Sequence, residues 1–363
     1  MKTCRIGIIG TGRIGKLHAE NICRQLPQFS LLGIADPYLD HDWAKSLRIP
    51  LVTKENEDLI QHPDIDVILI ASPSTFHPSQ IVAASCAKKA IFCEKPLGLT
   101  EMEIGHCLDV VNHHQTLLQV GFNRRFDPDF AYLQQSIRRG KIGKPHLVQI
   151  TSRDPAPPPK EYIKTSGGIF MDMSIHDFDM ARFLMGSEVT EVYAEGSVLI
   201  HSDFAECNDV DTAVIQLRFA SGALGVINNS RQAVYGYDQR VEVFGSEGTL
   251  LTHNQRQHAV IHLNKNETQL SNPLYFFLER YEAAYLAEMK AFYEAWYYQQ
   301  PSPVSGWDGL QALRIAVAAK QSLLTHQPVK IPQSNVATQG INSLETIHHT
   351  EHHVASHEVV VIN

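Results

Sequence analysis

Three polar residues interrupt an otherwise apolar segment at positions 167 to 184, which reads "GGIFMDMSIHDFDMARFL". Asp172, His176 and Asp179 are four and three positions apart, so a regular helix turning about 100° per residue would place them within an arc of about 60°. An imidazole and carboxylates at this spacing can accept and hold protons near neutral pH. A structural network of buried carboxylates and a satisfied histidine would give the same pattern.

Apolar residues border this polar stripe on both sides, and they are Met171, Ile175, Phe178, Met173, Met180 and Leu184. A helix lying on the protein surface would instead divide into one apolar and one polar face. We therefore expect the stripe to face a cleft between two apolar walls.

The first residues of the chain predict a dinucleotide site. The segment "CRIGIIGTGRIGKLHAENIC" reads as a strand, a turn with Gly10, Gly12 and Gly15, and a helix. The first glycine permits the tight turn, the second lets the backbone approach a pyrophosphate, and the third lets the helix pack closely on the strand. The helix N-terminus would then offer N–H donors to the phosphates.

A second strand, "LLGIAD", ends in Asp36, 21 positions after Gly15. A carboxylate in this place accepts hydrogen bonds from the adenosine ribose and repels a 2'-phosphate. The following residues, "PYLDHDW", add two acids and no arginine, so the sequence favours NAD over NADP. The alternative is that Asp36 only caps the strand.

Further apolar strands are expected at 66–72, 90–95 and 116–122, with helical segments between them. This alternation predicts a Rossmann-type, doubly wound parallel sheet in an α/β domain. Ligands of such sheets bind beyond the carboxyl ends of the strands. The candidates in the two loops there are Ser72, Thr75, His77, Glu94 and Lys95, of which His77 could equally be a structural loop residue.

Beyond residue 123 the pattern changes to period two, with expected strands at 146–153, 191–200, 211–220, 223–230 and 240–246. Short connections predict a mostly antiparallel open sheet with helices on one face, which makes the second part α+β. Its other face is not uniformly polar, which favours homo-oligomerisation. The predicted domains are 1–122 for NAD binding, 123–333 for substrate binding and oligomerisation, and 334–363 as a flexible tail with five histidines.

Composition narrows the classes of partner. The 31 basic and 39 acidic residues give a net charge of -8, which disfavours nucleic acid and anionic membranes as partners. The six cysteines form no CxxC pair, so we expect free thiols and no metal. The absence of an apolar run of membrane-spanning length and of a signal peptide indicates a cytoplasmic protein.

Four motifs in order give the chain a resemblance to the glucose-fructose oxidoreductase, inositol dehydrogenase and rhizopine catabolism (Gfo/Idh/MocA) family. They are "GTGRIG" at 10–15, "EKPLG" at 94–98, "GFNRRFDP" at 121–128 and the 167–184 segment. The resemblance covers nearly the whole chain apart from the tail, and "SRDPAPPP" and "YGYDQR" are most similar to inositol 2-dehydrogenases. It implies NAD-linked oxidation of a ring hydroxyl of a polyol such as myo-inositol, by a homotetramer. The alternatives are scyllo-inositol or a pyranose sugar as the substrate, and a non-catalytic NAD-sensing protein.

The resemblance also implies roles for individual residues. Lys95, Asp172 and His176 would be catalytic, and Arg13 and Ile14 would join the cofactor site. His176 is the expected base with Asp172 orienting it, although Lys95 could be the base instead. Besides the catalytic set, the residues expected to contact substrate are Arg125, Asp154, Asp179 and Tyr235. Arg125 could instead pair with Asp127, Asp154 could cap a loop, and Tyr237 could take the place of Tyr235.

Overall fold

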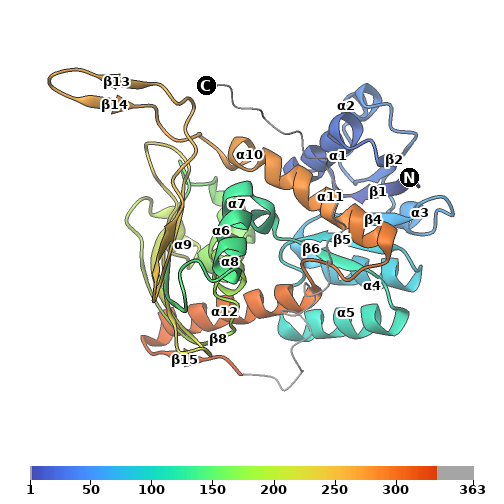
Figure 1. Ribbon diagram of the computed structural model, residues 1–363. Coiled ribbons are helices and arrows are strands. Elements are labelled where there is room, and N and C mark those ends of the chain that lie inside the picture. The colour runs from blue at the N-terminus through green and yellow to red at the C-terminus, as the bar shows by residue number, and fades with distance from the viewer. Residues whose placement is uncertain (1, 333–363) are drawn as a thin grey trace, which may run out of the picture.

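The computed structural model describes residues 2–332, which form two sheets with helices packed around them (Figure 1). The predicted tail at 334–363 lies outside the described residues. Within the described range, no helix is both long and apolar enough to cross a membrane.

The first sheet has six parallel strands in the order β3-β2-β1-β4-β5-β6. Its strands are β1 (Cys4–Ile9), β2 (Phe29–Ala35), β3 (Leu51–Thr53), β4 (Val67–Ile70), β5 (Ala90–Glu94) and β6 (Leu118–Gly121). The helices that connect them are α1 (Arg13–Gln25), α2 (His41–Ser46), α3 (Asn56–Ile60), η1 (Ser74–Phe76), α4 (His77–Cys86) and α5 (Glu101–His114). The doubly wound parallel sheet expected from the sequence is confirmed.

The second sheet has seven strands in the order β12-β11-β7-β10-β9-β8-β15. They are β7 (Pro145–Arg153), β8 (Val189–Ser197), β9 (Thr212–Phe219), β10 (Leu224–Ser230), β11 (Asp238–Gly245), β12 (Gly248–Leu251) and β15 (Val329–Lys330). Only the β7–β10 pair is parallel among its strand pairs in the described chain. The expected mostly antiparallel sheet with helices on one face is therefore confirmed (Figure 1).

The remaining elements cover or connect the two sheets. They are η2 (Asn123–Phe126), α6 (Pro128–Arg138), α7 (Lys160–Thr165), η3 (Phe170–Ser174), α8 (Ile175–Met185), α9 (Asp203–Glu206), β13 (Ile261–Leu263), β14 (Thr268–Leu270), α10 (Phe277–Arg280), α11 (Glu282–Tyr298) and α12 (Gly306–Thr325). Helix α12 contacts α8 and β8 on one side and α5 and β6 on the other, so it joins the two halves.

Helix α11 comes late in the chain and yet packs on the first sheet. Its residues Met289, Phe292 and Tyr293 belong to the same buried cluster as Ile6 and Phe92 of strands β1 and β5. The first strands of the chain and the late helix α11 therefore share one core.

The segment at 167–184 is not one regular helix, which corrects the expectation from its spacing. Residues 170–174 form the π-helical turn η3, and the α-helix begins only at Ile175. A π turn adds a residue to the helical repeat and changes the direction of the side chains that precede it. Asp172 and His176 therefore lie on different kinds of turn.

Candidate active site

The glycine-rich turn between β1 and α1 has the geometry that a pyrophosphate requires. Gly10 has φ +91°, and a Cβ atom there would lie 2.5 Å from the backbone nitrogen of Ser72. A Cβ on Gly15 would lie 1.9 Å from the carbonyl oxygen of Gly10. A Cβ on Gly12 would meet nothing within 4 Å, so the backbone is open on the side where a dinucleotide would approach.

Asp36 lies directly beside this turn, just after β2 ends. Its carboxylate accepts hydrogen bonds from the backbone nitrogens of Thr11 at 2.6 Å and Tyr38 at 2.8 Å. Tyr38 is 90% exposed. These residues fit the adenosine half of a dinucleotide.

The other expected cofactor residues are placed around the same strand ends. Arg13 is exposed at the start of α1, with its guanidinium 5.5 Å from the Phe276 ring centre, whereas Ile14 packs partly buried against the core. Thr75 is exposed in η1. The Ser72 hydroxyl donates a hydrogen bond to Gln80 at 2.6 Å.

His77 lies between the loops that follow β4 and β5. Its Nδ1 is 2.7 Å from the carbonyl oxygen of Pro96, and its Nε2 is 2.8 Å from that of Ser72. Both ring nitrogens are thus engaged by the protein backbone, which favours the structural alternative for this residue.

Lys95 and Asp172, from opposite halves of the molecule, are in direct contact. The Lys95 ammonium donates to the carbonyl oxygen of Asp172 at 2.9 Å and lies 3.5 Å from its Oδ1. Lys95 follows β5 and Asp172 lies on η3, so the contact spans the interface between the sheets. The sequence analysis placed Lys95 and Asp172 in one catalytic set, and the structure brings these two residues into contact.

Two partners of Asp172 were not foreseen from the sequence. The Tyr162 hydroxyl donates to Oδ1 at 2.8 Å, and Arg231 donates to Oδ2 at 2.9 Å. Burial opposes ionisation of Asp172, but Lys95 and Arg231 outweigh it and lower the pKa of this carboxyl. The position of Arg231 just beyond β10 was the one available signal, since residues at strand ends often line sites.

His176 does not bond to Asp172, contrary to the expectation that Asp172 would orient its ring. Its Nδ1 atom is buried and has no hydrogen-bond partner among residues 2–332. The ring instead lies edge-on to Phe122, with centroids 6.0 Å apart. Burial, with Lys95 and Arg124 nearby, holds the pKa of His176 well below its ordinary value, so the imidazole is neutral at neutral pH.

A buried network behind His176 holds the helix in place. Arg124 donates to Asp177 at 2.5 Å, and Asn229 donates to the other Asp177 oxygen at 2.8 Å. The Tyr237 hydroxyl lies 3.4 Å from Arg124 in the same network. Tyr237, the alternative left open by the sequence, is therefore linked to the residue that follows His176.

Arg125 and Asp179 form a buried pair with each other. Arg125 donates to both Asp179 oxygens, at 2.8 and 2.5 Å, and lies 2.9 Å from Asp308. Asp127 instead pairs with Arg280, so the Arg125–Asp127 alternative is wrong. The pair ties α8 to η2 and α12, which favours a structural role over substrate contact.

Asp154 and Tyr235 belong to two separate groups of polar residues. Asp154 accepts from Arg231 at 3.1 Å, so Arg231 bridges it to Asp172. The Tyr235 hydroxyl donates to Asp238 at 2.6 Å and accepts from Arg153 at 3.1 Å. Asp154 thus belongs to the cluster around Lys95, while Tyr235 takes part in a separate group at the end of β7.

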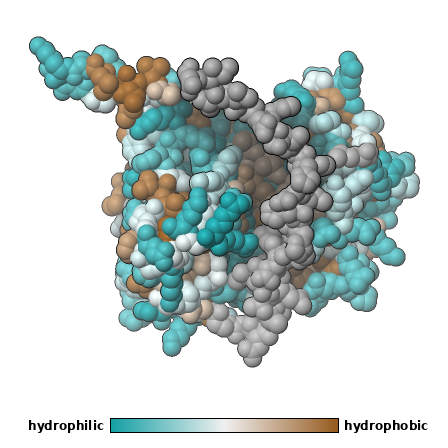
Figure 2. Space-filling view, in the orientation of Figure 1, coloured by the Kyte–Doolittle hydropathy of each residue, from teal (hydrophilic) through white to brown (hydrophobic). Residues whose placement is uncertain are grey.

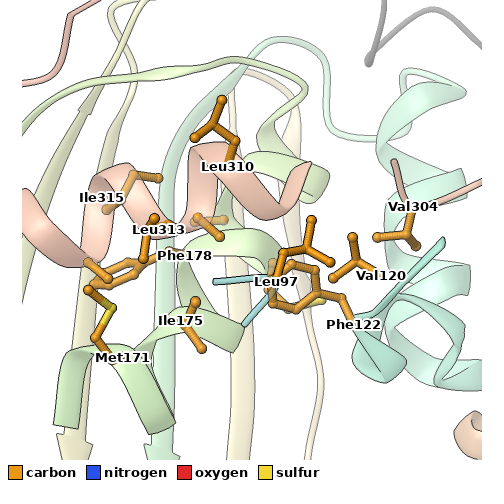
Figure 3. Close-up of a cluster of buried hydrophobic side chains, with 14 of the residues drawn as sticks. Leu97, Val120, Phe122, Met171, Ile175, Phe178, Val304, Leu310, Leu313 and Ile315 are labelled. Atoms are coloured by element: carbon orange, nitrogen blue, oxygen red, sulfur yellow. The ribbon is translucent and has the colours of Figure 1, made fainter. Parts of the chain in front are cut away.

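The apolar walls of the 167–184 segment pack as the sequence predicted. Ile175 and Phe178 are fully buried and belong to the same apolar cluster as Leu310 and Leu313 of α12 (Figure 3). Burying each such side chain stabilises the folded state by about 1.5–3 kcal/mol. These apolar contacts therefore fix the position of the segment that carries Asp172 and His176.

A groove of about 1040 Å³ lies elsewhere, lined by residues that include Lys2, Lys88, Gln115, Trp296 and Trp307. None of the predicted site residues, all of which the structure describes, lines it. We therefore place the candidate site by its chemistry, at Lys95, Asp172 and His176.

Comparison with known proteins agrees with this geometry. Residues 4–122 match the family model described as "Oxidoreductase family, NAD-binding Rossmann fold". Residues 134–331 match the model described as "Oxidoreductase family, C-terminal alpha/beta domain". The family model thus confirms the expected NAD cofactor.

Individual relatives are similar over most of their length. The chain is 52% identical over 327 residues to an uncharacterized oxidoreductase, YrbE, of Bacillus subtilis, covering 90% of this chain and 96% of the relative. It is 47% identical over 331 residues to a myo-inositol 2-dehydrogenase of Thermotoga maritima, covering 91% and 99%. The structure of a scyllo-inositol dehydrogenase of Lactobacillus casei with bound NAD(H) and scyllo-inositol has a TM-score of 0.86 at 32% identity, covering 91% and 99%.

Proposed function

The chain belongs to the Gfo/Idh/MocA oxidoreductase family, and from this premise we propose that it oxidises one ring hydroxyl of myo-inositol to a ketone, 2-keto-myo-inositol. The family models identify the chain as an NAD-dependent oxidoreductase. We propose the substrate and the roles of the individual residues. The contact of Lys95 with Asp172 at the carboxyl end of β5 carries the proposal, because it holds a cation at the edge of the sheet where ligands bind, and this cation can stabilise a hydroxyl oxygen that gains negative charge.

Oxidation of an alcohol removes a hydride from carbon and a proton from oxygen. NAD, when bound, supplies the acceptor for the hydride. The proton goes to a protein base, and the neutral imidazole of His176 can accept it. Lys95 donates a hydrogen bond to the same oxygen. Asp172 holds the Lys95 ammonium in position, and Arg231 in turn holds Asp172. In the alternative arrangement Lys95 is itself the base.

The polar groups around Lys95 suit a substrate that carries many hydroxyls. Asp154, Arg231, Asp172 and Tyr162 are already bonded to one another and are held in fixed directions. A polyol can bond to the donors and acceptors that these groups do not use among themselves, whereas a substrate without hydroxyls would desolvate them without a partner, at a cost of about 1–3 kcal/mol each. This argument favours a cyclitol or a sugar over an apolar alcohol.

Three other functions remain as alternatives. A dehydrogenase of scyllo-inositol or of a pyranose sugar would use the same groups, and the structural likeness to a scyllo-inositol dehydrogenase supports scyllo-inositol as the substrate. A non-catalytic NAD-sensing protein would have no need of the Lys95, Asp172 and His176 set, so the presence of all three argues against it.

A panel of substrates tests the proposal. The purified protein is incubated with NAD and, separately, with myo-inositol, scyllo-inositol, glucose and galactose, and NADH is followed by its absorbance. We expect the highest kcat/KM with myo-inositol and no turnover by a Lys95→Met variant. A higher kcat/KM with scyllo-inositol or a sugar would select that alternative, and no turnover with any polyol would contradict the enzyme assignment.

We also propose that the protein works as a homo-oligomer, a tetramer by the family resemblance, assembled through the outer face of the seven-stranded sheet. Strand pairing places Phe244, Leu147 and Leu224 side by side across β11, β7 and β10. Phe244 and Leu224 are each 47% exposed. A row of apolar side chains on a sheet face is typical of an interface.

A further inference from the structure

One histidine and two glutamates converge in the interior where α1, β5 and α11 meet. One ligand atom from each of His18, Glu94 and Glu288 lies within 4.8 Å of the others. His18 Nε2 is 2.8 Å from Glu94 Oε1. His18 and Glu288 have no exposed surface, and the Glu94 side chain is 12% exposed. The three residues come from segments far apart in the sequence.

Glu288 is the unusual member of this cluster. Both of its carboxylate oxygens are buried, and neither has a hydrogen-bond partner in the described part of the chain. Gln119 donates to the backbone carbonyl of Glu288 but forms no hydrogen bond with its carboxylate. A buried ionised carboxylate without a partner costs several kcal/mol, and a protonated one would still need an acceptor for its O–H group.

His18 is the one basic side chain paired with these carboxylates in the described chain, and its bond is to Glu94. Lys95 follows Glu94 in sequence, but its ammonium is bonded to Asp172. Within residues 2–332, no lysine or arginine forms an ion pair with Glu94 or Glu288. An ordered water could supply hydrogen bonds to Glu288 but would bring no positive charge to balance its ionised form.

We propose that His18, Glu94 and Glu288 bind a divalent transition-metal ion, although the cysteine pattern of the sequence suggested no metal. A mixed set of one imidazole and two carboxylates suits Mn²⁺, Fe²⁺ or Zn²⁺ better than Mg²⁺ or Ca²⁺, which favour oxygen ligands alone. Metal–ligand bonds of about 2.0–2.3 Å hold ligand atoms about 3–4.6 Å apart. The observed spacing meets this condition after small side-chain movements.

Such an ion would act as a structural cross-link. It would join the helix that follows the glycine-rich turn, the strand that precedes Lys95, and the late helix α11. Because these ligands are brought together only by folding, metal binding should stabilise the folded chain.

Metal content and thermal stability of the full-length protein test this site. We expect the purified protein to contain metal, its melting temperature to fall after EDTA dialysis, and Mn²⁺ or Zn²⁺ to restore it. Glu288→Gln should lose a molar equivalent of metal and the metal-dependent rise in melting temperature. Glu294→Gln, at an exposed position of the same helix, is the matched control and should behave as the wild type.

The histidines of the tail can also bind metal, but they contribute equally in every variant, so the difference between variants reports the buried site. If Glu288→Gln folds poorly, His18→Gln should lose the same molar equivalent of metal. The Co²⁺-loaded wild type should also show the visible absorption bands of protein-bound Co²⁺. Equal metal content in wild type and Glu288→Gln, or a wild-type melting temperature that metal leaves unchanged, would overturn the proposal.

Discussion

The proton acceptor is the first question at the scale of single residues. His176 is neutral, because burial and the nearby charges of Lys95 and Arg124 lower its pKa. If it is the base, His176→Ala should slow single-turnover hydride transfer by about 10²- to 10⁴-fold while NAD binding stays near normal. The measurement is stopped-flow NADH formation at saturating substrate across pH.

Lys95→Met is the counterpart in the same assay. If Lys95 is the base, this variant should be the more damaged of the two, and His176→Ala should mainly raise KM. Wild-type hydride transfer and pH dependence in His176→Ala would remove His176 from the role of base.

The lowered pKa of His176 also predicts how stability depends on pH. The unfolded chain binds a proton at this histidine near its ordinary pKa of 6.5, whereas the folded chain does so only at lower pH. The unfolded state therefore gains protons first as pH falls below about 6.5, and stability decreases by up to about 1.4 kcal/mol per pH unit. In urea titrations, His176→Asn should show a smaller decrease than the wild type between about pH 6.5 and 5. Parallel curves for the two proteins would contradict this prediction.

The predicted preference for NAD over NADP rests on Asp36, which lies beside the glycine-rich turn. Asp36→Ala combined with Tyr38→Arg should narrow the preference for NAD over NADP, because it removes a repulsive carboxylate and adds a phosphate partner. The ratio of kcat/KM for the two cofactors measures this. Tyr38→Arg alone is the control for the added charge, and an unchanged ratio in the double variant would show that another element reads the ribose.

At the scale of elements, the Arg125–Asp179 pair joins α8 to η2 and α12. Asp179→Asn removes one charge of a buried pair and should destabilise the fold by about 3–5 kcal/mol, with KM for the substrate little changed. Chemical denaturation and steady-state kinetics separate the two effects. Asp109→Asn, at an exposed position of α5, should be neutral, and a large KM increase with unchanged stability in Asp179→Asn would favour substrate contact.

Much of the candidate site was predictable from local patterns, and the rest depended on tertiary contacts. Glycine spacing predicted the turn at 10–15, and the strand ends predicted Lys95 and Asp36, because these patterns act over short distances. Tyr162 carries no local pattern and Arg231 has only its place after the end of β10, and only folding brings both residues to Asp172. The π turn at 170–174 was also hidden, since residue types that suit an α-helix suit a π turn as well.

At the scale of the whole molecule, the alternation of strands and helices predicted both sheets. It did not predict that α11 returns to the first sheet, because an apolar helix face does not specify which sheet it covers. Figure 2 shows another feature that the sequence did not reveal: apolar side chains, including Val260, Ile261 and Leu263, are exposed on the projecting arm of β13 and β14.

The outer face of the seven-stranded sheet gives the last prediction. Phe244 and Leu224 lie in one row with Leu147, and burying them against a second copy would remove apolar surface worth about 25 cal/mol per Å². Phe244→Glu combined with Leu224→Glu should therefore shift the protein to a smaller species in light scattering after size exclusion, because the new charges would be buried without partners. Leu324→Glu adds a charge at an exposed position of α12, the helix that covers the other face of the sheet, and should leave the mass unchanged. A wild-type monomer, or a double variant that keeps the wild-type mass, would show that this face is not the interface.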